Sequence, residues 1–264
     1  MKTSLTLFFF VTTLVLSNAQ EPTNNLSLAG SFRSVVHDGQ GNLYFGSTDN
    51  GVNSFFNGTW INDPQGPFVR DMERDIDGTI WVANAEFSGN FGGIRHYPDN
   101  SLQNVVRYTR LTTGQVFSSN RILDIEIKSI GDLIALGHEI QSNQNYNGGL
   151  TIGKRNGVDN YTWTNVTSGL PGGNRRVLTV AFSDAQTLWA YVESNGTFTG
   201  FIAEYSIANN GTVTYNGQVT GHGINFGTGS TGPRVTAMKR LQDLVWLGTW
   251  NDNRIHIYLS LIHI

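Results

Sequence analysis

A short motif that returns along the chain, with identical internal spacing in its two clearest copies, constrains the fold more than any other sequence feature. The motif reads Asp-x-x-Gly-x-(Leu or Ile)-aromatic, with an arginine eleven residues before the aromatic. Its two clearest copies run from Arg33 to Tyr44 and from Arg70 to Trp81. Three looser copies follow, and the five aromatic-strand positions that we align are 44, 81, 135, 189 and 246. Self-similarity of this kind indicates a repeat architecture.

Each copy is built of short apolar or alternating runs closed by Gly, Asn and Asp, which are typical of strands and tight turns. No stretch keeps a helical apolar period for several turns. A unit of a few strands cannot bury its apolar face alone, so the copies must stack on one another. We therefore predict an all-β fold, a β-propeller of about five four-stranded blades, with an incomplete ring left open as an alternative. A β-sandwich is the other alternative, but it does not require an Arg and an aromatic to return in step.

The N-terminal segment predicts export. Lys2 supplies a positive start, residues 5–15 form an apolar run too short to cross a bilayer, and Ser17-Asn18-Ala19 offers a cleavage site. We assign residues 1–19 to a signal peptide and residues 20–258 to the propeller repeats. The protein is expected to be secreted or extracytoplasmic, at the cell surface or in a periplasm, with no membrane span.

Composition excludes several kinds of chemistry and partner. The chain has no cysteine, which rules out disulfides, a thiolate nucleophile and cysteine-based metal sites. The chain has 17 basic and 20 acidic residues, so removal of Lys2 with the signal leaves a net charge of 16 − 20 = −4. This weak, mixed charge argues against a nucleic-acid partner.

The last six residues, 259–264, are apolar and follow the beginning of a strand. They resemble the translation of sequencing-adapter read-through, so we interpret them as a non-native tail. Under this hypothesis the native chain continues beyond Tyr258, and further blades or a sorting or signalling module would lie there.

Several segments resemble the two-component-regulator propeller repeat, a family of sensor ectodomains and secreted bacterial proteins. The resemblance rests on Asp75 to Trp81, on Trp246 to Trp250, and on Ser168 to Pro171 preceding Arg176. It extends over residues 30–258 and implies a propeller that recognises extracytoplasmic ligands, often glycans, without catalysis. This chain departs from the sensor pattern because it has no transmembrane helix, kinase domain or regulator domain.

The recurring arginine is the first candidate for a binding site. One arginine per copy should form a circle about the axis of a ring, and the five are Arg33, Arg70, Arg121, Arg176 and Arg234. A structural interpretation is that each guanidinium ties its strand to carbonyls of the adjoining blade. A functional interpretation is a basic annulus that holds an acidic sugar or a carboxylate.

Polar residues that follow the aromatic strand should gather at one rim of the ring. The candidate ligand-binding residues among them are Asp49, Glu86, Glu139, Glu193 and Trp250, accompanied by Thr48, Asn84, His138, Asn195 and Asn251. Such a rim suits hydroxyl-rich ligands, with the Trp as a stacking surface. Ordinary turn residues would give the same pattern.

No motif for catalysis, a metal or a cofactor is present. None of the six histidines lies at zinc-ligand spacing, and neither a nucleophile elbow nor a phosphate-binding loop occurs. Glycoside cleavage would need two facing carboxylates, for which the candidates are Glu73, Asp75, Glu86, Glu139 and Glu193. We therefore predict a non-catalytic propeller, without cofactor or metal, that binds a glycan or an extracellular protein. The alternatives are a propeller-type lyase or glycosidase, and the sensor portion of a longer two-component signalling protein.

Overall fold

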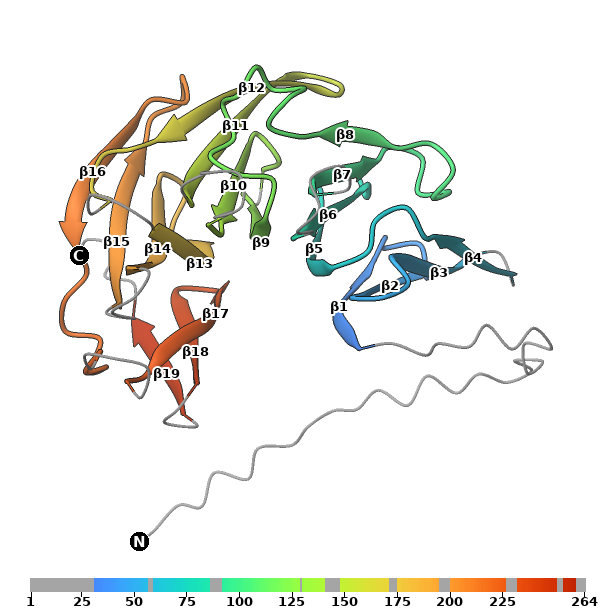
Figure 1. Cartoon of the computed structure of the whole chain (residues 1–264). Helices are drawn as coiled ribbons and strands as arrows, with labels where there is room; N and C mark the ends of the chain where they lie inside the picture. Colours follow the sequence, from blue (N-terminus) through green and yellow to red (C-terminus); the bar gives the residue numbers. More distant parts are fainter. Residues whose placement is uncertain are drawn as a thin grey trace, which may run out of the picture.

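The computed structural model describes residues 31–56, 59–85, 92–128, 130–140, 148–170, 175–194, 200–226, 232–250 and 254–259. Every helix or strand found in these ranges is a β-strand, labelled in Figure 1, and they contain no helix fit to span a membrane. The signal peptide assigned to residues 1–19 lies outside the described ranges, as do residues 260–264 of the assigned tail.

The strands form five antiparallel sheets, which we call blades 1 to 5. Within each blade, every strand pairs with the next strand along the chain. Blade 1 consists of β1 (Phe32–His37), β2 (Leu43–Ser47), β3 (Val52–Phe56) and β4 (Thr59–Asp63). Blade 2 consists of β5 (Val69–Arg74), β6 (Ile80–Asn84), β7 (Gly93–Tyr97) and β8 (Val106–Tyr108). Blade 3 consists of β9 (Ile122–Ile127), β10 (Leu133–His138), β11 (Gly149–Gly157) and β12 (Asn160–Val166). Blade 4 consists of β13 (Arg175–Phe182), β14 (Thr187–Ser194), β15 (Gly200–Ile207) and β16 (Val213–Gln218). Blade 5 consists of β17 (Arg234–Leu241), β18 (Leu244–Trp250) and β19 (Ile255–Leu259).

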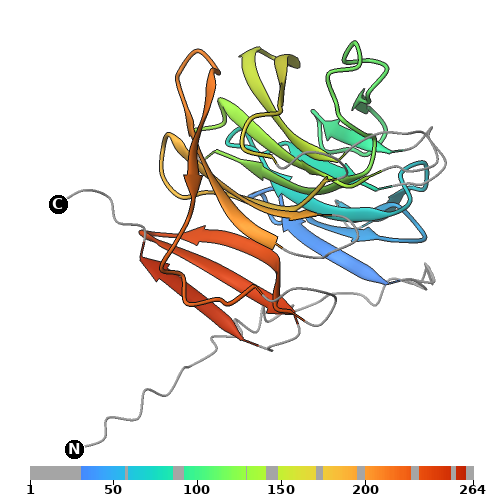
Figure 2. The ribbon, with the colours of Figure 1, turned by 60° about the vertical axis from the view of Figure 1, so that its left-hand side comes forward.

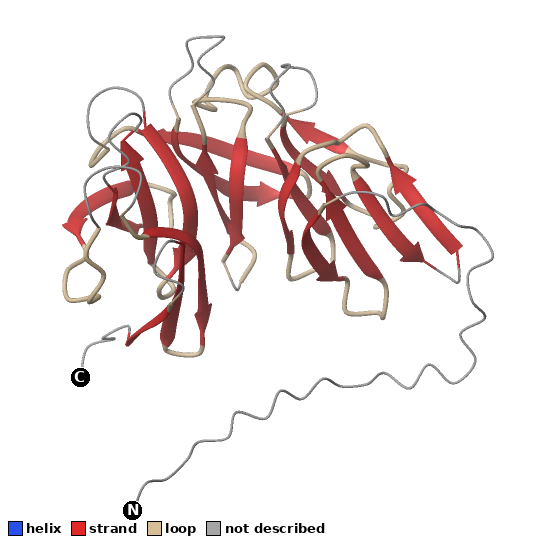
Figure 3. Ribbon diagram, turned by 60° about the horizontal axis from the view of Figure 1, so that its bottom comes forward, coloured by secondary structure: helices blue, strands red, loops and turns tan. Residues whose placement is uncertain are grey.

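The first strand of each blade lies innermost, because β1 contacts β5, β5 contacts β9, β9 contacts β13, and β13 contacts β17. Figures 1 and 2 show the blades following one another along an arc from blade 1 to blade 5, and Figure 3 shows their strands in a single colour. The predicted all-β propeller of five blades is confirmed, with four strands in blades 1 to 4 and three in the described part of blade 5. Radial sheets exclude the β-sandwich.

The predicted alignment of the aromatic positions is also confirmed. Each position lies on the second strand of its blade and pairs with the equivalent residue of the first strand: Tyr44 with Val36, Trp81 with Glu73, Ala135 with Glu126, Trp189 with Ala181, and Trp246 with Lys239. The third copy is the one without an aromatic, because Ala135 stands there. Even so, it occupies the same place in its sheet.

The Asp and Gly of the motif form the turn between the first two strands. Gly41 and Gly78 have φ angles of 104° and 88°, a left-handed conformation that favours glycine. Oδ1 of Asp38 accepts a hydrogen bond from the backbone of Gln40 at 2.7 Å, as side chains in Asx-turns do. The constant spacing of the motif therefore reflects turn geometry.

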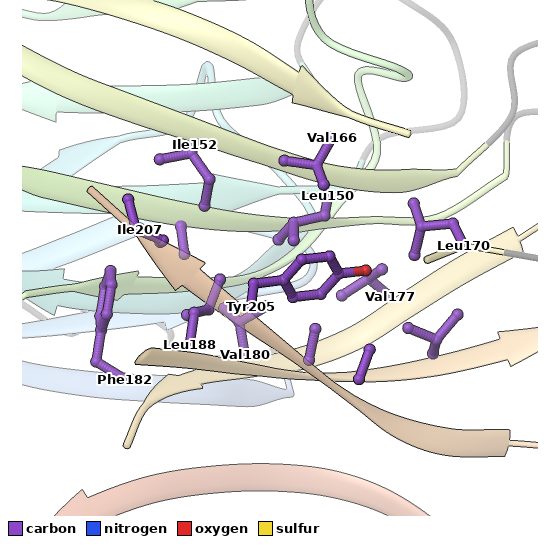
Figure 4. Close-up of a cluster of buried hydrophobic side chains, with 14 of the residues drawn as sticks. Leu150, Ile152, Val166, Leu170, Val177, Val180, Phe182, Leu188, Tyr205 and Ile207 are labelled. Carbon is purple, nitrogen blue, oxygen red and sulfur yellow. The ribbon is translucent and has the colours of Figure 1, made fainter. Parts of the chain in front are cut away.

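The continuous apolar runs of the second strands are explained by burial on both faces. In β6, Ile80 and Val82 belong to a cluster with Tyr44 of blade 1. The alternate residues Trp81 and Ala83 pack in a cluster with blade 3. Figure 4 shows the corresponding layer between blades 3 and 4, where Leu150 and Ile152 lie above Leu188 and Tyr205.

The faces at the two ends of the arc are more exposed than those between blades. Leu43 of blade 1 is 45% exposed, whereas its equivalent Ile80 is fully buried. On blade 5, Trp246 is 37% exposed, whereas its equivalent Trp81 is fully buried. Blades 2, 3 and 4 therefore have two covered faces, and blades 1 and 5 have one each.

A ladder of hydrogen bonds joins the innermost strands. In each step a short oxygen-bearing side chain accepts from the backbone N–H of the next blade. The steps are Met72 to Ser34 at 3.1 Å, Ile125 to Asp71 at 3.3 Å, Val180 to Asp124 at 2.7 Å, and Met238 to Thr179 at 3.0 Å. The four acceptors are equivalent, since each follows the β-bulge of its strand.

Candidate binding rim

The arginines of the motif occupy two backbone positions and not one. Arg33 and Arg70 are the bulged residues of β1 and β5, left without a partner in the register. Arg176 and Arg234 pair directly with Glu193 and Trp250, and the bulge follows two residues later. Arg121 belongs with these two, because it also lies two residues before the bulge of its strand, and its carbonyl accepts the N–H of Glu139, the residue after β10. The predicted single slot is therefore wrong: every first strand has an equivalent bulge, and Arg33 and Arg70 lie on it, whereas the other three arginines lie two residues before it.

Three of the arginines form a continuous network with two glutamates across blades 3, 4 and 5. Glu139 lies 2.6 Å from Arg121 through Oε2 and 3.1 Å from Arg176 through Oε1. Oε2 of Glu193 lies 2.6 Å from Arg176 and 2.5 Å from Arg234. Each carboxylate thus bridges its own blade and the next one.

The network ends on an aromatic ring. The guanidinium of Arg234 lies 5.6 Å from the centroid of Trp250, within the range of a cation–π contact. Trp250 is 55% exposed, whereas Glu193 is fully buried. The exposed ring of Trp250 therefore offers an apolar surface next to the guanidinium of Arg234, which pairs with the buried carboxylate of Glu193.

The two remaining arginines extend the same rim electrostatically. Burial lowers the pKa of Arg70, and the charge of Arg33 lowers it further, while Glu139 opposes both effects. Burial likewise lowers the pKa of Arg121, against Glu139, and the charges of Arg70 and Arg176 add to the effect. Although their backbone positions differ, all five arginines are thus linked from blade 1 to blade 5. We call this group, with Glu139, Glu193 and Trp250, the Arg rim.

The Arg rim has a surplus of positive charge. Five arginines face two glutamates, and Asp49 lies at the same end of blade 1, so these described residues have a formal charge of 5 − 3 = +2 on a chain whose net charge is −3. Arg33 and Arg70 form no ion pair or hydrogen bond through their side chains with the residues that the structure describes. The two carboxylates that pair with arginines lie on blades 3 and 4, so the arginines without such a pair are those of blades 1 and 2.

The other predicted rim residues fall at different places. Asp49 follows β2 at the same end of blade 1, is exposed, and accepts a hydrogen bond from Thr48 at 3.2 Å. Glu86 lies outside the described residues, together with Asn195 and Asn251. His138 is fully buried, and burial lowers its pKa to about 4. It is therefore a core residue and not a rim residue.

A second group of carboxyls, which the sequence did not reveal as a cluster, lines the axis. Asp71 and Asp124 share a hydrogen bond, and burial raises the pKa of both. Burial also raises the pKa of Glu126 to about 8, although Lys239 opposes this effect. Glu73 lies on the same strand as Asp71 and also contacts Lys239.

One trio has the geometry of a nucleophile, a base and an orienting acid. Nε2 of His96 lies 2.9 Å from Oγ1 of Thr79, and Nδ1 lies 2.7 Å from Oδ1 of Asp159. Thr79 is only 9% exposed, and its hydroxyl also donates a hydrogen bond to Oδ1 of Asp77 at 2.6 Å. The trio joins blades 2 and 3, since Thr79 and His96 lie on blade 2 and Asp159 lies between the last two strands of blade 3. No group of three or more His, Asp or Glu side chains within the described ranges is placed to hold a metal ion.

The fold and the Arg rim define a β-propeller with a cationic face. No protein-family profile and no curated protein sequence matches the chain. Among solved structures, the chain is similar to the extracellular domain of a hybrid two component system from B. thetaiotaomicron, with a TM-score of 0.56 and 12% identity over 86% of this chain and 27% of the other. It is also similar to the WD40 repeats of RRP9, with a TM-score of 0.54 and 11% identity over 86% of this chain and 66% of the other. The chain thus spans about a quarter and about two thirds of these structures, and the likeness concerns the fold.

Proposed function

We propose that the protein is an extracytoplasmic, non-catalytic propeller that binds a glycan or a protein partner at the Arg rim. The observation that carries the proposal is the surplus positive charge of the rim on an otherwise acidic chain. The export signal predicted at residues 1–19 and the extracellular location of one structural neighbour support the compartment.

The chemistry of the rim favours a ligand with carboxylate or sulfate groups. Guanidinium groups bind such oxygens through two parallel hydrogen bonds. Arg176 already engages two carboxylates and so has a structural role in joining blades. Arg33 and Arg70 carry no such pairing with described residues and are the arginines best suited to a ligand. Trp250 would stack on an apolar face of the same ligand, as aromatic rings do in sugar sites.

The test is binding of the whole chain to an array of acidic and neutral glycans and of acidic peptides. Arg33→Gln with Arg70→Gln should lower affinity for an acidic binder by about 10- to 100-fold, since charge-assisted hydrogen bonds contribute about 1.5–3 kcal/mol. Arg240→Gln is the matched control, because Arg240 lies at the opposite end of β17 and pairs only weakly with Asp243, at 3.9 Å.

The outcome separates the interpretations left open by the sequence. If the double variant unfolds, or binds as well as the wild type, the arginines have a structural role and the rim is not the binding site. Product analysis on every binder distinguishes simple binding from a lyase or glycosidase, which would release shortened glycans.

A further inference from the structure

Lys239 connects blades that are not neighbours along the arc. It lies on β17 of blade 5, whose sequence neighbour is blade 4. Its Nζ is 2.7 Å from Oε2 of Glu126 on blade 3, and it also contacts Oε1 of Glu73 on blade 2. The side chain therefore reaches across the axis, where it joins one end of the arc to its middle.

The register explains why these three side chains meet. Lys239, Glu126 and Glu73 occupy equivalent positions on their innermost strands, opposite the aromatic position of the second strand. The same position is Val36 in blade 1 and Ala181 in blade 4. Lys239 is the one cation of this layer, and the layer supplies two carboxylates for it.

Other charged groups facing the bridge lie one layer away. Asp71 and Asp124 come from the same strands as the two glutamates and share a hydrogen bond. The corresponding residues of the other blades are the uncharged Ser34, Thr179 and Ala237. Asp71 and Asp124 thus lie beside the two glutamates of the bridge, and the hollow next to it is also lined by Lys128, Asp184 and Arg240.

Blade 5 packs on blade 4 by one face and adjoins a hollow near the bridge. A hollow of about 430 Å³ adjoins the bridge and is lined by Glu126, Phe182, Lys239 and Gln242, among others. Val235 and Val245 anchor blade 5 on blade 4 by apolar contacts, but Trp246 on the opposite face is 37% exposed. Blade 5 is therefore covered on one face only, and the bridge adds a contact from a second direction.

We propose that Lys239 is a positioning residue for the Arg rim. Its bridge to Glu73 and Glu126 fixes the separation between blade 5 and blade 2, which we call the opening of the arc. Blade 5 carries Arg234 and Trp250 at one end of β17 and β18. The opening of the arc sets how far these two residues stand from Arg70 on blade 2. This role of Lys239 deepens the proposed binding function, and its effect on ligand binding rests on that function.

The arc opening is measurable without any ligand. The chain has no cysteine, so spin labels can be attached at Leu111→Cys near blade 2 and Ile255→Cys on blade 5, which replace residues that are 83% and 69% exposed. Pulsed electron–electron double resonance on the otherwise native chain should give one narrow distribution of distances between the two spin labels. Lys239→Met should shift or broaden it beyond the width of the native peak, and Lys239→Arg should restore it.

Lys128→Met is the matched control, since Lys128 pairs within its own blade with Asp132 at 3.2 Å. It should leave the distance unchanged. If Lys239→Met does not fold, Glu73→Ala with Glu126→Ala removes both acceptors of the same bridge and takes its place. A native distribution in either folded variant overturns the proposal.

A second readout links the bridge to the rim. If an acidic glycan or peptide binds, Lys239→Met should weaken its binding without removing any residue of the Arg rim. If no ligand is found, the proposed function fails, whereas the distance measurement still decides the role of Lys239.

Discussion

Asp124 of blade 3 accepts, through Oδ2, a hydrogen bond of 2.7 Å from the backbone N–H of Val180 in blade 4. This contact is one step of the ladder that joins the innermost strands, so it holds two sheets together with a single side chain. Burial raises the pKa of Asp124 well above its usual value, and the charge of Asp71 adds to the effect. Burial and the charge of Asp71 thus favour the protonated form of this carboxyl.

An amide has the same shape as a carboxyl and keeps an acceptor oxygen without the charge that burial disfavours, and this gives the first prediction. Asp124→Asn should keep the acceptor and change the free energy of unfolding little. Asp124→Ala should leave the N–H of Val180 buried without a partner and cost about 1–3 kcal/mol. Urea unfolding of both variants at pH 7 checks this. Equal losses in the two variants would mean that the carboxyl acts as a charge.

The second prediction concerns stability above pH 6.5. Burial raises the pKa of Glu126 to about 8 in the folded chain, so the folded state holds a proton that the unfolded chain has already lost. Stability must therefore fall as the pH rises toward 8, because the unfolded state binds fewer protons there. Below pH 6.5 the buried histidines act in the opposite direction, since burial lowers the pKa values of His96 and His138.

Urea unfolding between pH 6.5 and 8 measures this slope. Glu126→Gln should flatten it, because the amide does not titrate, and Glu204→Gln, on β15, should leave it unchanged. A stability that rises with pH in this window would contradict the assignment.

The sequence predicted the part of the fold that depends on hydrophobic pattern. Tyr44, Trp81 and Trp246 align in the structure as they do in the motif. The apolar run around Trp81 is explained by burial on both faces, whereas blades 1 and 5 keep such a run with one face covered. The Asp and Gly of the motif were equally visible, since the turn needs a left-handed residue at Gly41 and Gly78.

The candidate site was only partly predictable. Glu139 and Glu193 were expected at the rim, but their sharing between arginines of two blades depends on side-chain geometry. Arg33 and Arg70 stand eleven residues before their aromatic positions, whereas Arg121, Arg176 and Arg234 stand fourteen, thirteen and twelve residues before theirs. This difference in spacing corresponds to the two backbone positions that the structure shows. The ladder acceptors carry a faint signal, since Ser34, Asp71 and Thr179 each stand ten residues before the aromatic position. Their different side chains conceal it.

The third prediction concerns the shared carboxylate of the Arg rim. Glu193 is fully buried and lies within hydrogen-bonding distance of both Arg176 and Arg234. Glu193→Ala should cost about 3–5 kcal/mol, since removal of one partner from a buried pair leaves the other charges uncompensated. Asp243→Ala, at the exposed end of blade 5, should cost little. Thermal unfolding followed by circular dichroism compares the two variants, and similar losses would mean that the network adds nothing to stability.

The fourth prediction separates stability from binding at two tryptophans. Trp81 is fully buried and stacks on His96 with 4.1 Å between ring centroids, so Trp81→Ala should cost about 3–5 kcal/mol. Trp250 is 55% exposed, so Trp250→Ala should change the free energy of unfolding by only about 0.5 kcal/mol. If the ring stacks on a ligand, Trp250→Ala should weaken the binding of any glycan found on the array, and Trp250→Phe should restore part of it. Unfolding and binding curves of the same preparations check both halves, and a Trp250→Ala variant that unfolds early but binds normally would assign this residue to the fold.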